Sequence, residues 1–99
     1  MRPAAREEDL HVCPMTEKTS KGDYPHRGGT ILAPCSPNVF ISGKPAARAG
    51  DKLFCRGHEN NIAGGSGTVM INGRPAARAG DPTTHGGWID SGAPTVNIG

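Results

Sequence analysis

The residues of this 99-residue chain best suited to chemistry are three cysteines and four histidines. Four of them lie two or four residues after an aspartate that recurs along the chain: His11, Cys13, Cys55 and His85. Imidazole nitrogen and thiolate sulfur are the ligands that Zn²⁺ prefers in structural sites, where four of them form a tetrahedron. The pattern predicts a structural metal site, because four protein ligands leave no open position for a reacting water.

The residues suggest a ligand set of three histidines and one cysteine: His11, His26, Cys55 and His85. His26 is included because Gly-Gly closely follows it, as it follows His85, and glycines let the backbone crowd a site. Cys13 competes with His11, since it lies four residues after its aspartate, as Cys55 and His85 do. The spacing leaves this choice open, and it leaves Zn²⁺ open against another divalent ion such as Fe²⁺.

The other metal-binding residue types have simpler interpretations. An odd number of cysteines at unmatched spacings argues against a disulfide framework. Cys35 follows a proline in a loop and is predicted to be a small buried hydrophobe. His58 is predicted to be an exposed loop residue.

A repeat positions the proposed ligands. Residues 39–51 and 69–81 are almost identical, and a third copy is divided between the ends of the chain, beginning at 96–99 and ending at 3–9. If the repeats circle an axis, the carboxyl terminus arrives where the amino terminus begins. We therefore predict a closed, pseudo-threefold ring of three hairpins rather than a linear solenoid. Closure would bring the three loops that follow the aspartates together at one end of the axis.

The elements of this ring are predicted to be short strands. Residues 39–41, 69–71 and 96–98 alternate with β-branched residues in phase. Ser-Gly follows the first run and Asn-Gly the second, and Asn-Gly after an alternating run is a hairpin signal. Helices are nearly excluded, because 15 glycines and 9 prolines interrupt the chain.

The repeated motif is predicted to be structural rather than catalytic. Its small residues let backbones approach, and its arginine and aspartate lie three residues apart, where they can pair across a turn. Such a pair at a surface contributes only about 0–1 kcal/mol. The motif comprises, in its two uninterrupted copies, Pro45, Ala46, Ala47, Arg48 and Asp51, and Pro75, Ala76, Ala77, Arg78 and Asp81.

This doubled Pro-Ala-Ala-Arg motif resembles the PAAR-repeat family, and the resemblance extends through residues 3–14, 25–29 and 85–87 to cover nearly the whole chain. It implies an all-β fold: a small cone-shaped, pseudo-threefold arrangement of short β-hairpins with Gly/Pro-rich loops, closed by a structural metal at the apex. It also implies one Zn²⁺ held by three histidines and one cysteine, which fall on His11, His26, Cys55 and His85.

The function that the resemblance implies is that of a spike tip. Such a protein caps the trimeric VgrG spike of a bacterial type VI secretion system and sharpens it for membrane puncture; a pseudo-threefold base suits one chain per trimer. Two features depart from the family pattern. Glu7-Glu8 replaces the Ala-Gly of the other copies, and we expect no toxin extension of the kind that many family members carry. We therefore expect a single domain over residues 1–99, with any effector protein docking as a separate chain.

Composition bears on the competing functions. A net charge of +2 without a basic run, and aromatic residues that do not interleave with Lys or Arg, argue against a zinc-stabilised nucleic-acid module. A zinc hydrolase would need a water ligand and a base such as Glu59 or Asp90, and we predict no enzyme. No apolar run predicts a membrane span or a signal peptide, so we expect synthesis in the cytoplasm, delivery with the spike and only transient contact with a target membrane.

Overall fold

A computed structural model describes residues 1–25, 28–55 and 59–99. Within these residues every regular element is a strand, most of them two residues long, which confirms the all-β prediction. The strands are β1 (Arg2–Pro3), β2 (Leu10–Val12), β3 (Thr16–Thr19), β4 (Gly22–Pro25), β5 (Gly29–Thr30), β6 (Phe40–Ile41), β7 (Lys44–Pro45), β8 (Lys52–Leu53), β9 (Asn60–Asn61), β10 (Met70–Ile71), β11 (Arg74–Pro75), β12 (Trp88–Ile89) and β13 (Asn97–Ile98).

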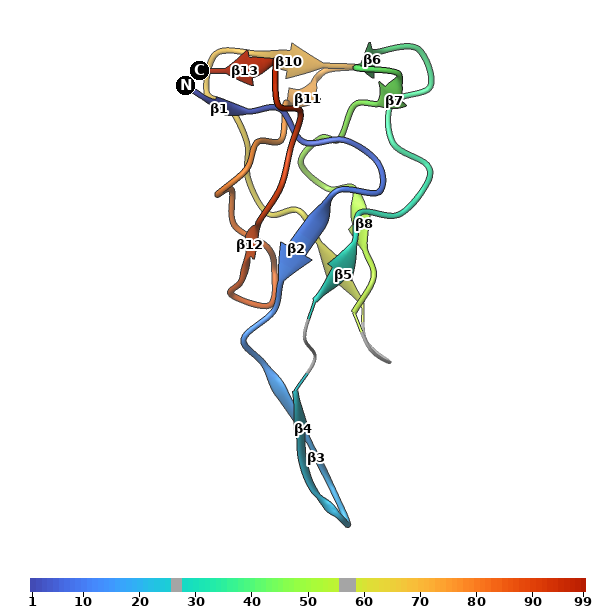
Figure 1. The fold of residues 1–99 in the computed structure, drawn as a ribbon, viewed down its shortest axis with the longest axis vertical. Helices are drawn as coiled ribbons and strands as arrows, with labels where there is room; N and C mark the ends of the chain where they lie inside the picture. The colour runs from blue at the N-terminus through green and yellow to red at the C-terminus, as the bar shows by residue number, and fades with distance from the viewer. Residues whose placement is uncertain (26–27, 56–58) are drawn as a thin grey trace.

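Three equivalent hairpins form the broad end of the molecule (Figure 1). Strand β6 pairs with β7, and β10 pairs with β11, across two-residue turns. Both turns have positive φ at both positions, 50° and 81° at Ser42-Gly43 and 54° and 78° at Asn72-Gly73, which is the type I′ geometry that suits strand twist. The third pair joins β1 to β13, so the two chain ends lie side by side and complete the divided repeat.

Backbone hydrogen bonds close the ring on its axis. The amide of Ala5 donates to the carbonyl of Ala77, that of Ala77 to Ala47, and that of Ala47 to Ala5, each at 3.0 Å. All three side chains are fully buried. Only a methyl group fits where three backbones approach so closely, which explains the second alanine of each motif. This cyclic pattern confirms the pseudo-threefold arrangement.

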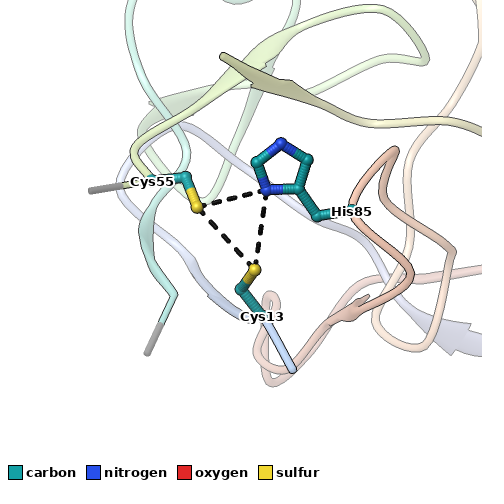
Figure 2. A group of neighbouring side chains, drawn as sticks. All are labelled: Cys13, Cys55 and His85. Carbon is teal, nitrogen blue, oxygen red and sulfur yellow. Dashed lines mark hydrogen bonds between the residues drawn. The ribbon is translucent and has the colours of Figure 1, made fainter. Parts of the chain in front are cut away.

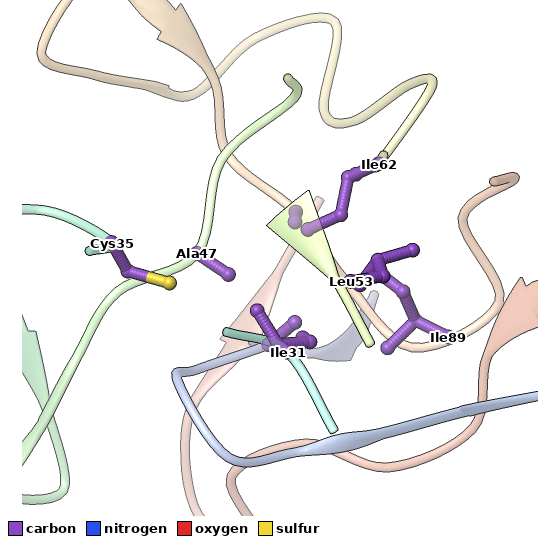
Figure 3. Close-up of a cluster of buried hydrophobic side chains, with 8 residues drawn as sticks. Ile31, Cys35, Ala47, Leu53, Ile62 and Ile89 are labelled. Carbon is purple, nitrogen blue, oxygen red and sulfur yellow. The ribbon is translucent and has the colours of Figure 1, made fainter. Parts of the chain in front are cut away.

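A second tier of hairpins continues from the ring toward the narrow end. Strand β2 pairs with β5, β8 pairs with β9, and Pro82 pairs with Trp88 of β12. Bridges link each hairpin to the next, at Ile31–Leu53, Ile62–Thr83 and Trp88–Val12, so the wall closes on itself. Its buried interior is the main core cluster, drawn in Figure 3 and composed of Ala5, Ile31, Cys35, Ala47, Leu53, Ile62, Ala77 and Ile89.

The aspartate of each motif is buried and its arginine is buried or half-buried, so the pairs do not lie at the surface as the sequence suggested. Arg48 donates from Nε and Nη2 to the two carboxylate oxygens of Asp51 at 3.1 and 3.0 Å, and its backbone amide donates at 2.8 Å. Arg6–Asp9 and Arg78–Asp81 repeat this geometry. The exposed fractions of the Arg48 and Asp51 side chains are 9% and 3%. The pairs are therefore fixed, bidentate parts of the fold rather than weak surface contacts.

One element has no counterpart in the repeat. Strands β3 and β4 form a four-residue hairpin, with Thr16 opposite Pro25 and Thr19 opposite Gly22. It projects from the narrow end in Figure 1 and contributes to a long axis of 44 Å against widths of 23 and 22 Å. Nothing in the repeat predicts this projection, which elongates the cone.

Candidate metal centre

Three of the seven cysteines and histidines meet in one group, as Figure 2 shows: Cys13, Cys55 and His85. The sulfur atoms of Cys13 and Cys55 are 3.7 Å apart. Nδ1 of His85 lies 3.6 Å from the sulfur of Cys13 and 3.3 Å from that of Cys55. Both cysteines are buried and His85 is half-buried. Among the described residues, these are the side chains of types that bind metals that lie close enough together, three in number, to hold one ion.

The ring explains why these residues meet. Each lies four residues after the aspartate of its repeat, so the three occupy equivalent positions around the axis. Side chains alternate along a strand, and the residues two and four positions after the aspartate therefore both point inward. The fourth position lies nearer the narrow end, where the wall converges. Equivalent positions thus deliver three ligands to one point.

The separations fit three corners of a tetrahedral metal site. Zn–S bonds of about 2.3 Å and Zn–N bonds of about 2.0–2.1 Å place two sulfurs about 3.8 Å apart and a sulfur and a nitrogen about 3.6 Å apart. The observed distances of 3.7, 3.6 and 3.3 Å match this within a few tenths of an ångström. A disulfide, at about 2.05 Å, is far shorter than the sulfur separation here.

His11 lies apart from this group. It is buried, and its Nε2–H donates to the carbonyl of Phe54 at 2.6 Å, while its Nδ1 has no hydrogen-bond partner among the described residues. Two residues after its aspartate, it occupies the position of the buried residues Leu53 and Thr83 in the other repeats. Of the two residues that the sequence left open, Cys13 is the one brought to the group. The offset of four residues was the signal for it.

Two histidines considered in the sequence analysis, His26 and His58, lie outside the described residues. Of the four ligands in the expected set, the structure therefore brings together Cys55 and His85, separates His11 from them, and leaves His26 as a prediction.

The sequence matches a known protein family. A model of the PAAR motif matches residues 21–91, which is most of the chain. The chain belongs to the PAAR-motif family. No curated protein matches the sequence. Proteins with the PAAR motif are structural spike-tip proteins, and this membership agrees with the all-β ring described above. Among the described residues, no helix has the length and apolar character needed to cross a membrane.

The glycines beside the site allow the PAAR strands to crowd around it. A Cβ on Gly87 would lie 1.8 Å from the carbonyl oxygen of Val12, and one on Gly28 would lie 2.0 Å from that of His11. Gly28 and Gly86 also have positive φ, at 81° and 87°. One glycine of each Gly-Gly pair, Gly28 or Gly87, therefore presses against the strand β2 that directly precedes Cys13, as expected for glycines near the ligands.

Cys35 is buried in the core cluster, as predicted for a small hydrophobe. Its thiol donates to the carbonyl of Leu32 at 3.5 Å. Burial first, and then the carboxylates of Asp51 and Glu7, raise the pKa of Cys35 to about 12. The thiol therefore stays protonated at neutral pH, and protonated sulfur is a poor metal ligand. Glu59 and Asp90, the two acids considered as bases for a hydrolase, both lie on the surface.

Proposed function

We propose that this chain caps a trimeric VgrG spike, with one chain per trimer and its broad end against the spike. The observation that carries the proposal is the cyclic set of alanine hydrogen bonds in a PAAR-motif chain. A pseudo-threefold body fits a threefold partner, because each hairpin can meet one equivalent site on the trimer.

The broad end offers an apolar surface for this contact. Ile41, Ile71 and Ile98 point into the core, so the preceding residue of each strand points away from it. Phe40 and Met70 take that position in two hairpins, with 58% and 59% of their surface exposed. Exposed large hydrophobics at equivalent positions are typical of a docking face.

We also propose that one Zn²⁺ closes the narrow end. Cys13, Cys55 and His85 would hold it, and His26, from the sequence, is the proposed fourth ligand in a set of two cysteines and two histidines. The ion supplies folding free energy by joining the three segments that carry its ligands; structural zinc sites contribute on the order of 10 kcal/mol. With four protein ligands, the role is structural and the contribution of the chain is mechanical.

The shape supports a piercing role. The body narrows from the end that holds β6, β10 and β13 toward the end from which the β3–β4 hairpin projects (Figure 1). A sheath that drives the spike forward would bring this end to a membrane first. Effector proteins that dock as separate chains remain a prediction, which co-purification from secreting cells would test.

Native mass spectrometry of the chain mixed with a VgrG trimer tests the proposal. We expect one chain and one zinc ion per three spike chains. Phe40→Asp combined with Met70→Asp should abolish the complex and leave the zinc bound. Leu10→Asp, a charge placed at a leucine of β2 that is 50% exposed, is the control and should leave the complex intact. A complex of three chains with three would contradict the symmetry argument.

A further inference from the structure

Asn60 is a buried polar residue beside the metal group, with 1% of its surface exposed. It lies on β9 opposite Leu53, two residues before the buried Ile62. The equivalent positions in the other two repeats, two residues before Ile31 and Ile89, are glycines. The fold thus forms twice without a side chain at this position, and folding alone does not call for a carboxamide here.

The carboxamide oxygen of Asn60 binds the loop that carries His85. Oδ1 accepts from the hydroxyl of Thr84 at 2.9 Å and from the backbone amide of His85 at 3.3 Å. It also accepts from the amide of Asn61 at 3.0 Å, and the amide of Thr84 donates to the carbonyl of Asn61 at 2.9 Å. One oxygen atom therefore ties the ligand loop to the strand pair that leads to Cys55.

The nitrogen of the same carboxamide does not bind the His85 loop. Nδ2 of Asn60 is buried and has no hydrogen-bond partner in the part of the chain that the structure describes. A buried donor left unpaired costs about 1–3 kcal/mol, so the residue carries a penalty that a glycine at this position would avoid. The hydrogen bonds to the His85 loop are the compensating feature.

We propose that Asn60 is a positioning residue for His85, which holds the loop so that Nδ1 faces the two sulfurs before the metal arrives. The inference rests on the proposed metal site. The loop needs such a tie because it contains Gly86 and Gly87, and Gly86 takes a positive φ of 87°. A loop ordered in advance loses less conformational entropy on binding, and this raises affinity.

The test compares Asn60→Gly, which copies the residue of the other two repeats, with the natural chain. Co²⁺ affinity is measured by competition with a chromophoric chelator, and the Co²⁺ absorption bands report the ligand set. We expect affinity to fall 10- to 100-fold, the range found when a group supporting a ligand is removed, with one ion still bound and thiolate-to-cobalt bands retained. Asn97→Gly, at an exposed asparagine of the broad end, is the matched control and should bind as the natural chain does.

A second variant covers the case in which Asn60→Gly does not fold. Thr84→Val removes one donor to Oδ1 from an exposed side chain, and we expect a several-fold loss of Co²⁺ affinity with unchanged stability of the metal-free form. In the metal-free protein, the amide resonance of His85 should broaden in both variants.

The outcomes separate this inference from the metal site itself. Equal affinity of the natural chain and Asn60→Gly, or of the natural chain and Thr84→Val, would overturn the role of Asn60. Failure of the natural chain to bind Co²⁺ or Zn²⁺ would instead overturn the metal site on which the inference rests.

Discussion

Removing the carboxylate of Asp51 should destabilise the fold far more than the loss of a surface ion pair. Asp51 accepts from the backbone amide, Nε and Nη2 of Arg48, and also from Nη2 of Arg74 at 2.9 Å. Asp51→Ala leaves the buried guanidinium of Arg48 without its counter-ion. Breaking one side of a buried pair costs about 3–5 kcal/mol. For a domain of this size, that loss lowers the melting temperature by at least about 12 °C.

The measurement is urea denaturation of the metal-saturated protein, followed by far-UV circular dichroism. Arg74→Met is the matched control, because Arg74 contacts the same carboxylate from a side chain that is 41% exposed; its loss should cost no more than about 1 kcal/mol. Asp51→Asn keeps the shape and should fall between the two. If Asp51→Ala costs no more than Arg74→Met, the buried pair is not a determinant of the fold and the reasoning is wrong.

Three further predictions concern other parts of the molecule. His11→Leu should keep one metal ion per chain in elemental analysis, because His11 lies outside the metal group; a fall below one would make it a ligand. The pKa of the Cys35 thiol is raised to about 12, so the thiol should react with iodoacetamide at pH 8 far more slowly in the folded protein than in urea. The protonated thiol should contribute its full share to the free energy of unfolding below pH 9, the ordinary pKa of a cysteine, and this share should be lost as the pH rises toward 12. Joining Gly99 directly to Met1 and opening the chain between residues 72 and 73 should preserve the fold within about 1 kcal/mol, because the new turn has the two-residue length of the others; a permuted chain that fails to fold would contradict the ring.

The ring could be predicted because its signal is sequence identity at matched spacing. Two intact copies and one divided copy require the ends to meet, and the pairing of Arg2 with Ile98 confirms it. The choice between His11 and Cys13 could not be made as easily. His11 lies on β2 and Cys13 directly follows that strand, both at inward positions, so only their height along the axis separates them, which is a property of the assembled wall.

Two other features depend on contacts that the sequence does not display. The Arg–Asp pairs are strong because neighbouring repeats cover them, and burial of this kind follows from the tertiary structure. The hairpin of β3 and β4 lacks a counterpart in the other repeats, and its segment, residues 16–25, mixes polar residues at both alternating positions. Neither repetition nor periodicity could therefore reveal it. The role of Asn60 was missed although it does lie in a repeat. Its position holds glycine in the other two repeats, and this difference is visible only once the repeats are aligned by their buried isoleucines.

The cyclic hydrogen bonds between the alanines determine how the body would fail under load. In an open sheet, an outer hairpin can be peeled away by breaking its bonds one after another, each at a small force. Here each hairpin is bonded to a neighbour on either flank, so detaching one requires both contacts to rupture together. The ring of hairpins is interrupted covalently between the two chain ends, where β1 and β13 form the same kind of antiparallel pair as the strands of the two intact hairpins. Compression along the long axis is thus shared among three arms, and the body should yield as a whole rather than unzip from its seam.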